Sequence, residues 1–199
     1  MTLDFAHRVA VTLRLNGRDV TTVVSPRTTL LDWLREEMGL TGAKKGCNEG
    51  ACGTCTVLVD GHRMNGCLTL AVQCADREIT TVEGLAGPGG EAHPVQRAFA
   101  EHDAFQCGYC TPGQLMSAVA CIAEGHACDD GVVREWMSGN ICRCSAYPQI
   151  TAAVLAAAQE AQGAPGTQAA PGTQAAPGTQ AAPGTQAAPG AQETRGTRR

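Results

Sequence analysis

Hydrophobic and polar residues alternate near the start of the chain. This pattern predicts β-strands, because successive side chains of a strand point to opposite faces. Two alternating stretches within residues 9–24 flank Asn16 and Gly17, a pair that accepts the positive φ angles of a tight turn. Apolar stretches at 56–59 and 79–82 predict two further strands. The first part of the chain is therefore expected to form a sheet that starts with a hairpin.

A helical spacing interrupts these strands. Leu30, Leu31 and Leu34 form one apolar face within residues 29–38, and a threonine precedes them as a candidate N-cap. Strands around one helix, with a cysteine-rich loop between them, predict a small α+β domain over residues 1–83.

The pattern becomes helical after the Gly-Pro-Gly-Gly stretch at 87–90, which is typical of a linker. Four helices are expected, at 94–102, from Pro112 onward, at 130–137 and at 148–162. This half of the chain is therefore expected to form a second, all-α domain over residues 84–162.

A six-residue repeat of Ala, Pro, Gly, Thr and Gln fills the end of the chain, residues 163–199. Proline and glycine at this density prevent helix formation, and the repeat has almost nothing apolar to bury beyond alanine. A β-helix with six-residue turns would lack a core. We expect a disordered tail.

Charge and composition exclude several functional classes. The net charge is −4, and no basic stretch interleaved with aromatic residues is present, so nucleic acid is not an expected partner. No apolar run approaches the ~20 residues that a membrane span needs. The first residues alternate like a strand and show no export signal, so the chain is expected in the cytoplasm unless a partner subunit carries such a signal for a whole complex.

Eleven cysteines shift the interpretation toward metal or redox chemistry, because an odd count without an export signal fits a disulfide framework poorly. Cys47, Cys52, Cys55 and Cys67 follow the spacing C-x4-C-x2-C…C of plant-type 2Fe-2S proteins. Each iron takes two thiolates, and the small residues between the cysteines let backbone N–H groups approach the cluster. Zinc sites usually pair two short hooks and fit this spacing less well.

A second set consists of Cys107, Cys110, Cys142 and Cys144. The first two precede a predicted helix N-terminus, where unpaired N–H groups favour thiolates. Four thiols in the spacing C-x2-C…C-x-C suit either an iron–sulfur cluster or zinc, and spacing alone leaves both open.

The remaining chemistry-bearing residues show no pattern. Cys74, Cys121 and Cys128 are assigned no role, and the five histidines match no ligand spacing. Dinucleotide, phosphate-loop and nucleophile motifs are absent from the sequence, so no catalytic residue is expected. The chain is predicted to hold redox centres and not to act on a substrate itself.

Four stretches resemble a known family in order and spacing: KGCNEGACGTCTV at 45–57, NGCL at 65–68, FQCGYCTPG at 105–113 and SGNICRCSAYP at 138–148. Over roughly residues 8–160 the chain is similar to the small iron–sulfur subunit of molybdenum hydroxylases. These enzymes are of the xanthine dehydrogenase, aldehyde oxidoreductase and carbon monoxide dehydrogenase type. Many family members have glycine where this chain has Ser145, a departure that could alter a hydrogen bond to Cys144.

The resemblance implies a fold, cofactors and site residues. The fold would be a β-grasp ferredoxin domain followed by a four-helix domain. The cysteines of the first set would hold the 2Fe-2S cluster nearer the flavin, and those of the second set the cluster nearer molybdenum. Gln106 matches a glutamine that hydrogen-bonds the pterin, and Cys144 the cysteine whose sulfur approaches it.

The resemblance also implies partners. A large catalytic subunit would bind molybdopterin, in its cytosine dinucleotide form, and a medium subunit would bind FAD. The three would form a heterotrimer, and two heterotrimers often associate in the family. The chain would carry electrons between them during oxidative hydroxylation of an aldehyde, a purine or another N-heterocycle. The alternatives are a free-standing two-cluster electron carrier and, from a different class, a zinc-stabilised interaction module.

Overall fold

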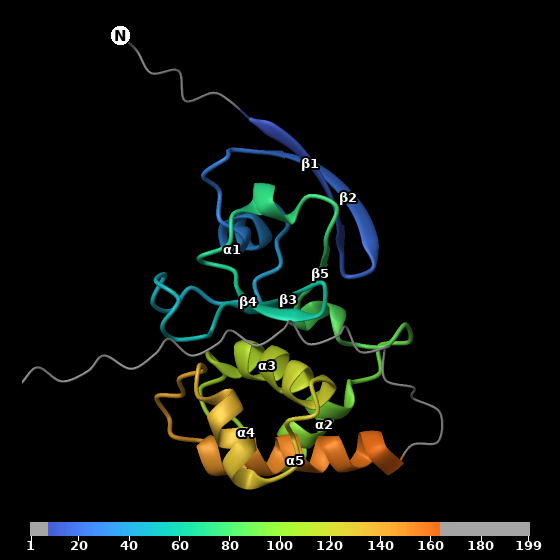
Figure 1. Cartoon of the computed structure of the whole chain (residues 1–199), viewed down its shortest axis with the longest axis vertical. Helices are drawn as coiled ribbons and strands as arrows, with labels where there is room; N and C mark the ends of the chain where they lie inside the picture. Colours follow the sequence, from blue (N-terminus) through green and yellow to red (C-terminus); the bar gives the residue numbers. More distant parts are fainter. Residues whose placement is uncertain (1–7, 164–199) are drawn as a thin grey trace, which may run out of the picture. The chain divides into compact units, whose positions relative to one another are not determined.

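The computed structural model describes residues 8–163 (Figure 1). The strands are β1 (Val9–Leu15), β2 (Arg18–Val24), β3 (Thr56–Val59), β4 (His62–Asn65) and β5 (Glu78–Thr80). The helices are α1 (Leu30–Asp32), α2 (Pro94–Glu101), α3 (Thr111–Ala123), α4 (Asp130–Met137) and α5 (Tyr147–Gly163). Short 3₁₀ turns lie at Ala71–Cys74 and Val82–Gly84. The predicted tail lies outside the described residues, except for Gly163, which ends α5.

The five strands form one mixed sheet in the order β2-β1-β5-β3-β4. Strands β1 and β2 form the predicted hairpin, and Asn16 and Gly17 adopt the expected positive φ angles of 48° and 77°. The central pair β1–β5 is parallel, whereas β5–β3 and β3–β4 are antiparallel. The alternation of β1 puts Val11 and Leu13 into the core. This domain is therefore α+β, as predicted.

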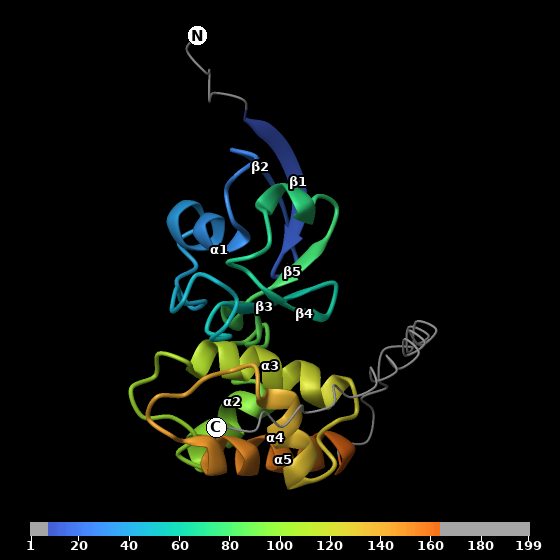
Figure 2. The same ribbon diagram turned by 60° about the vertical axis from the view of Figure 1, so that its left-hand side comes forward.

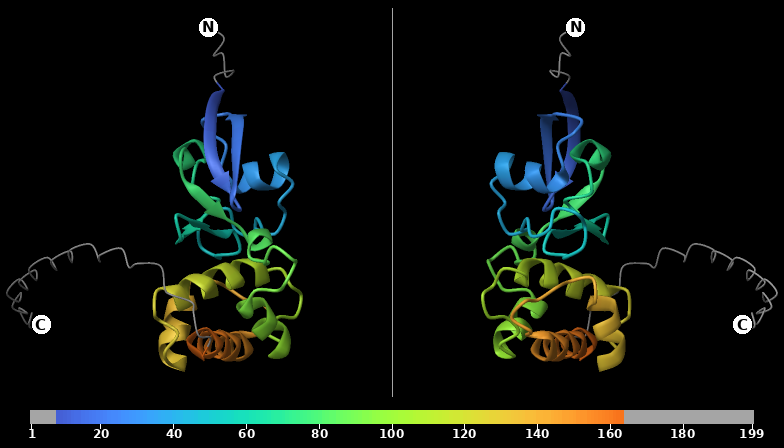
Figure 3. Two further views of the ribbon diagram at one scale, coloured as in Figure 1. Left: turned by 90° about the vertical axis from the view of Figure 1, so that its right-hand side faces the viewer. Right: turned by 90° about the vertical axis from the view of Figure 1, so that its left-hand side faces the viewer.

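The predicted helix at 29–38 differs from the structure. The chain forms only one α-helical turn, α1, and then widens into a π-helix over Trp33–Glu37. The π turn closes with a hydrogen bond from Met38 N to Trp33 O of 3.0 Å. Thr29 caps the start as expected, since its Oγ1 accepts from Asp32 N. Helix α1 lies beside the sheet in Figures 2 and 3, and its side chains complete the core of this domain.

Helices α2 to α5 form the second, helical half, and each begins within one residue of its predicted start. Their shared core contains Phe99, Leu115, Val133 and Val154. Helix α5 packs against α2 and α4, and α3 faces the sheet (Figures 1 and 2). Among the described residues, no helix has both the length and the apolar character needed to cross a membrane.

The two halves have separate cores, but they touch through a third apolar cluster. Leu58 of β3 packs there against Met116 and Ala120 of α3. The described residues form a single compact unit, so no free linker separates the two halves. The division at residue 83 remains a prediction from sequence.

Candidate iron–sulfur centres

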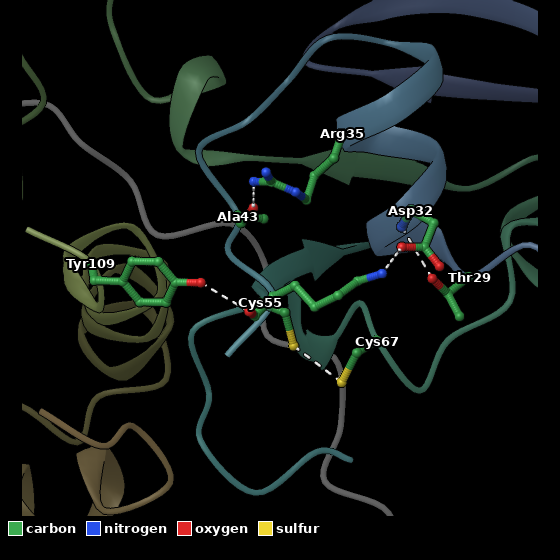
Figure 4. A network of polar contacts seen from close by, with 8 residues as sticks. Thr29, Asp32, Arg35, Ala43, Cys55, Cys67 and Tyr109 are labelled. Carbon is green, nitrogen blue, oxygen red and sulfur yellow. Dashed lines mark hydrogen bonds and ion pairs between the residues drawn. The ribbon is translucent and has the colours of Figure 1, made fainter. Parts of the chain in front are cut away.

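The first cysteine set lies between the π-helix and the start of the 3₁₀ turn at Ala71–Cys74. Cys55 and Cys67 are buried on either side of the β3–β4 hairpin, and their sulfurs lie 3.4 Å apart (Figure 4). Cys47 and Cys52 lie in the preceding loop, are half-buried, and share a contact between their side chains. The four thiols thus associate as two pairs.

This pairing bears on the kind of metal centre. Two thiolates on one tetrahedral metal, at metal–sulfur distances of about 2.3 Å, lie roughly 3.8 Å apart. Cys55 and Cys67 are therefore close to the spacing needed to share one metal. Within residues 8–163 no three or more histidine, cysteine or carboxylate side chains gather around a single point that could hold an ion. A 2Fe-2S cluster takes its four thiolates as two such pairs, one on each iron.

The loop that carries Cys47 and Cys52 is anchored to the helix beside the sheet. Lys45 forms an ion pair with Asp32, and the hydrogen bond from Lys45 holds the pKa of that carboxyl below its usual value. Arg35 Nη1 donates hydrogen bonds of 2.9 Å to the carbonyls of Thr41 and Ala43, and Figure 4 shows the bond to Ala43. These contacts hold residues 41–45, which lead into the cysteine loop, against the helical segment of Asp32 and Arg35.

Within this loop the glycines have a steric role. A Cβ at Gly46 would lie 2.8 Å from Cys52 Sγ, and Gly50 adopts a φ of 78° that side chains rarely accept. The backbone N–H of Glu49 donates to Cys47 Sγ at 3.4 Å, as expected for a loop that surrounds anionic sulfur.

The thiols of the first set ionise differently. The backbone hydrogen bond from Glu49 lowers the pKa of Cys47 to about 7. Burial raises the pKa of Cys55 to about 12. Cys47 is therefore more readily deprotonated to a thiolate, whereas Cys55 needs a nearby metal charge to lose its proton.

The first two cysteines of the second set lie at the N-terminus of α3, as predicted, and the other two follow α4. Cys110 occupies the N-cap position of α3, with Cys107 three residues before it, and Cys142 and Cys144 lie between α4 and α5. These thiols again form two pairs, Cys107 with Cys144 and Cys110 with Cys142.

The second set repeats the contrast between one thiol with a lowered pKa and one with a raised pKa. A hydrogen bond from the backbone of Tyr109 lowers the pKa of Cys107, and burial raises that of Cys110 to about 12.

An unpartnered hydroxyl adjoins this second set. Thr111 Oγ1, in the residue after Cys110, is the one buried side-chain oxygen or nitrogen without a hydrogen-bond partner in residues 8–163. A buried hydroxyl normally has an acceptor, because leaving it unpaired costs free energy. The sulfur of a cluster could supply such an acceptor.

The predicted pterin contacts lie together at the surface. Gln106 Nε2 donates a hydrogen bond of 3.3 Å to the carbonyl of Cys144, and Gln106 is exposed. Their roles toward a pterin stay a prediction. Ser145 follows with a φ of 61°, in the left-handed region where glycine is favoured. That conformation gives a physical reason for the glycine that many family members carry at this position.

The structure joins the two sets through backbone groups that sequence patterns did not single out. Ile141 N donates a hydrogen bond of 3.0 Å to the carbonyl of Cys52. Tyr109 Oη donates one of 2.9 Å to the carbonyl of Lys45 (Figure 4). The second contact reaches the segment just before Cys47, so the loop of Cys47 and Cys52 touches both ligand segments of the second set.

A buried polar network supports this junction. The amide of Asn140 donates to Gly53 O at 2.9 Å and accepts from Ser117 Oγ at 2.6 Å. Gln114 Nε2 donates to the carbonyl of Asn140 at 3.0 Å. A Cβ at Gly113 would lie 2.3 Å from Gly53 O, so glycine allows this close approach. No motif indicated this network, because each contact joins residues far apart in the sequence.

The other cysteines stay outside both sets. Cys74 and Cys121 are buried in the two cores, and Cys128 is exposed. All eleven cysteines lie within the described residues, and none forms a disulfide.

Two protein-family models match the chain, and they cover the two halves in turn. A 2Fe-2S iron-sulfur cluster binding domain matches residues 13–78, and a [2Fe-2S] binding domain matches residues 81–155. The fold and these matches together define a protein with two 2Fe-2S-binding domains.

Curated relatives identify the family. The aldehyde oxidoreductase iron-sulfur-binding subunit PaoA of Escherichia coli K12 is 52% identical over 165 residues, which cover 75% of this chain and 72% of the relative. The nicotine 6-hydroxylase small subunit of Paenarthrobacter nicotinovorans is 47% identical over 148 residues, covering 74% and 88%. This chain belongs to the family of small iron–sulfur subunits of molybdenum hydroxylases.

Solved structures agree with that assignment. A chain of quinoline 2-oxidoreductase from Pseudomonas putida 86 superposes with a TM-score of 0.75 at 45% identity, covering 79% of this chain and 98% of that one. The aldehyde oxidoreductase of Desulfovibrio gigas gives a TM-score of 0.74 at 35% identity. There the match covers 78% of this chain but only 17% of the larger protein.

Proposed function

We propose that this chain is the electron-transfer subunit of a heteromeric molybdenum hydroxylase. The large partner subunit would oxidise a C–H bond of an aldehyde, a purine or another N-heterocycle, with water as the source of oxygen. The two electrons released would pass one at a time from its molybdopterin centre, through this chain, to FAD on the medium subunit. The observation that carries the proposal is the direct hydrogen bond between the two cysteine sets, from Ile141 N to Cys52 O.

The chain's own residues hold the two centres. Cys47 with Cys52 and Cys55 with Cys67 would each bind one iron of the first cluster, in the β-grasp domain that the strand order supports. For the second cluster the pairs would be Cys107 with Cys144 and Cys110 with Cys142. When bound, each 2Fe-2S cluster supplies a centre that takes up and releases one electron at a time.

The route between the centres is short in chemical terms. Cys52 is a ligand of the first set, and Ile141 directly precedes Cys142 of the second. One backbone hydrogen bond of 3.0 Å therefore connects a proposed ligand residue of the first cluster to the residue next to a proposed ligand of the second. Gly113 leaves room for the two loops to approach, and Asn140 holds them together through its hydrogen bond to Gly53.

Exposed apolar side chains lie next to both cysteine sets, and they support the proposal that a partner subunit covers each set. Phe105, Tyr109 and Tyr147, each near half exposed, surround the second set and would face the molybdopterin-binding subunit. Leu68, 63% exposed, follows Cys67 and would face the FAD-binding subunit. A free-standing carrier has less reason to expose such residues next to both of its centres.

We place the complex in the cytoplasm, where eleven cysteines without a disulfide fit a reducing compartment. The chain itself would contribute no catalytic residue. Molybdopterin, in its cytosine dinucleotide form, and FAD would belong to the large and medium subunits of a heterotrimer, and two heterotrimers could associate.

Isolation of the native chain with its partners tests the proposal. We expect a coloured complex with about four irons per copy of this chain, together with molybdenum and flavin in two larger subunits. About four irons in a chain that elutes alone would support the free-standing carrier instead. A colourless chain that contains zinc would refute both.

A further inference from the structure

A second fastening point between the two halves lies away from the Asn140 network. Arg63 of β4 reaches across to the helical half, where its Nη1 donates a hydrogen bond of 2.8 Å to the carbonyl of Trp136. Its guanidinium carbon lies 4.7 Å from the centre of the Trp136 ring, and its Nη2 lies 3.5 Å from a carboxylate oxygen of Glu124. One side chain thus contacts a helix carbonyl, a ring face and a carboxylate.

Each contact suits a guanidinium for a physical reason. The carbonyl of Trp136 belongs to the last turn of α4, where the helix dipole favours a cation. A planar guanidinium stacks on an aromatic ring while its N–H groups remain free to donate, which an ammonium cannot do. The ring is itself held in place, because His126 stacks on it with centroids 3.8 Å apart and an interplanar angle of 14°.

The positions of these residues in the chain connect the contact to both centres. Arg63 lies four residues before Cys67, and Trp136 lies six residues before Cys142. Strand β4 and helix α4 therefore lead directly into ligand residues of different cysteine sets. A shift of β4 against α4 would move the two sets relative to each other.

A cavity of about 230 Å³ separates the two fastening points. Arg63 and Asn65 lie on its ferredoxin-like side, and Ser117 and Asn140 lie on its helical side. Arg63 and Asn140 thus hold the two halves together at different sides of this cavity. Outside these two points the interface includes the small apolar cluster around Leu58.

We infer that Arg63 is a positioning residue that fixes the separation and orientation of the two iron–sulfur clusters. The inference rests on the proposed function only in so far as it requires both clusters. The contacts of Arg63 are with Trp136 and Glu124, and neither residue belongs to a cysteine set. It acts through the segments that carry Cys67 and Cys142.

The test compares Arg63→Gln and Arg63→Lys with Arg77→Gln in the full chain within its complex. Arg77 is a matched control, because its ion pair with Asp60 is exposed and lies within the ferredoxin-like half. In the fully reduced protein, electron paramagnetic resonance detects each cluster and the magnetic splitting between them, which falls steeply with distance. We expect Arg63→Gln to keep both signals and lose splitting, Arg63→Lys to lose part of it, and Arg77→Gln to match the parent protein.

Hydrogen exchange provides a second readout that does not depend on resolved splitting. Backbone amides at 138–142, including the Ile141 N–H that bonds to Cys52, should exchange faster in Arg63→Gln and not in Arg77→Gln. Unchanged splitting and unchanged exchange in Arg63→Gln would overturn the inference. If Arg63→Gln does not assemble, Arg63→Lys decides by the same two measurements. Absence of one cluster signal from the parent protein would instead refute the proposed function.

Discussion

Asn140 Nδ2 donates a hydrogen bond of 2.9 Å to the carbonyl of Gly53, which lies 87 residues earlier in the chain. The contact links the loop that carries Cys52 to the segment that carries Cys142 and Cys144. Because Asn140 is only 5% exposed, water cannot replace its partners easily. The separation of the two candidate clusters therefore depends on one buried amide and on the groups around it.

Replacing this amide should weaken the junction. In Asn140→Ala the Ser117 hydroxyl and the Gly53 carbonyl both lose a partner while still buried. We expect a loss of about 2–4 kcal/mol in the free energy of unfolding, measured by denaturant titration of the isolated holo-chain. Ser117→Ala removes only the hydroxyl and should cost about 1 kcal/mol. An Asn140→Ala chain as stable as its parent would show that the network carries little of the interface.

Gly113 offers a steric test of the same junction. A Cβ there would meet Gly53 O at 2.3 Å and Thr54 Cα at 3.0 Å, and both are backbone atoms that no rotamer change can move aside. We expect Gly113→Ala to separate the loops and cost about 1–3 kcal/mol. Gly139→Ala is the matched control in the same region, because a Cβ at Gly139 has no atom within 4 Å. Thermal unfolding of the two variants side by side should show a lowered midpoint for Gly113→Ala alone.

The ligand assignment predicts different outcomes for two cysteines of similar chemistry. Cys144→Ser should alter or remove the resonance signal of the second cluster and block reduction of the flavin by substrate in the complex. Cys128→Ser should change neither, since Cys128 is exposed and belongs to neither set. Rapid-mixing spectroscopy of flavin reduction, together with iron analysis, makes the comparison. Normal flavin reduction in Cys144→Ser would refute its role as a ligand on the electron path.

Local patterns in the sequence predicted much of this fold. The hairpin around Asn16-Gly17 and the four helices depend on turn chemistry, capping and periodicity, which short segments carry by themselves. Strand β4 was missed because the segment HRMN contains one apolar residue and pairs along one edge only. The π-helix was missed because an apolar face does not distinguish i→i+4 from i→i+5 hydrogen bonding.

The candidate site likewise has a part that the sequence predicted and a part that it did not. Cysteine spacing indicated both sets, because ligands of one cluster recur at fixed local intervals. The junction between the sets could not be predicted, since Gly53 and Cys52 contribute backbone carbonyls that carry no side-chain identity. Arg63 and Trp136 gave no signal either, because their 73-residue separation is closed only by the folded chain.

The unpartnered hydroxyl of Thr111 should tune the second cluster. If it donates to a cluster sulfur, the bond strengthens as the cluster gains negative charge on reduction, so its loss makes reduction harder. A difference of about 1 kcal/mol corresponds to roughly 40 mV for one electron. We expect Thr111→Val to lower the midpoint potential of the second cluster by tens of millivolts, whereas Thr111→Ser should keep it. A redox titration followed by electron paramagnetic resonance measures both, and the first cluster serves as the internal control.

His93 gives the helical half a dependence on pH. Its Nδ1 accepts a hydrogen bond from Val95 N and caps α2, which requires a neutral imidazole. Burial, followed by the nearby charge of Arg97, lowers the pKa of His93, while Glu160 acts weakly in the opposite direction. Because the folded-state pKa lies below that of the unfolded chain, His93 contributes its stability fully above about pH 6.5, and that stability is lost as the pH falls toward the folded-state value. His93→Asn retains a capping side chain but does not titrate. The unfolding midpoint should fall less between pH 7.5 and pH 6 in this variant than in the parent chain, and equal slopes would mean that His93 does not carry the dependence.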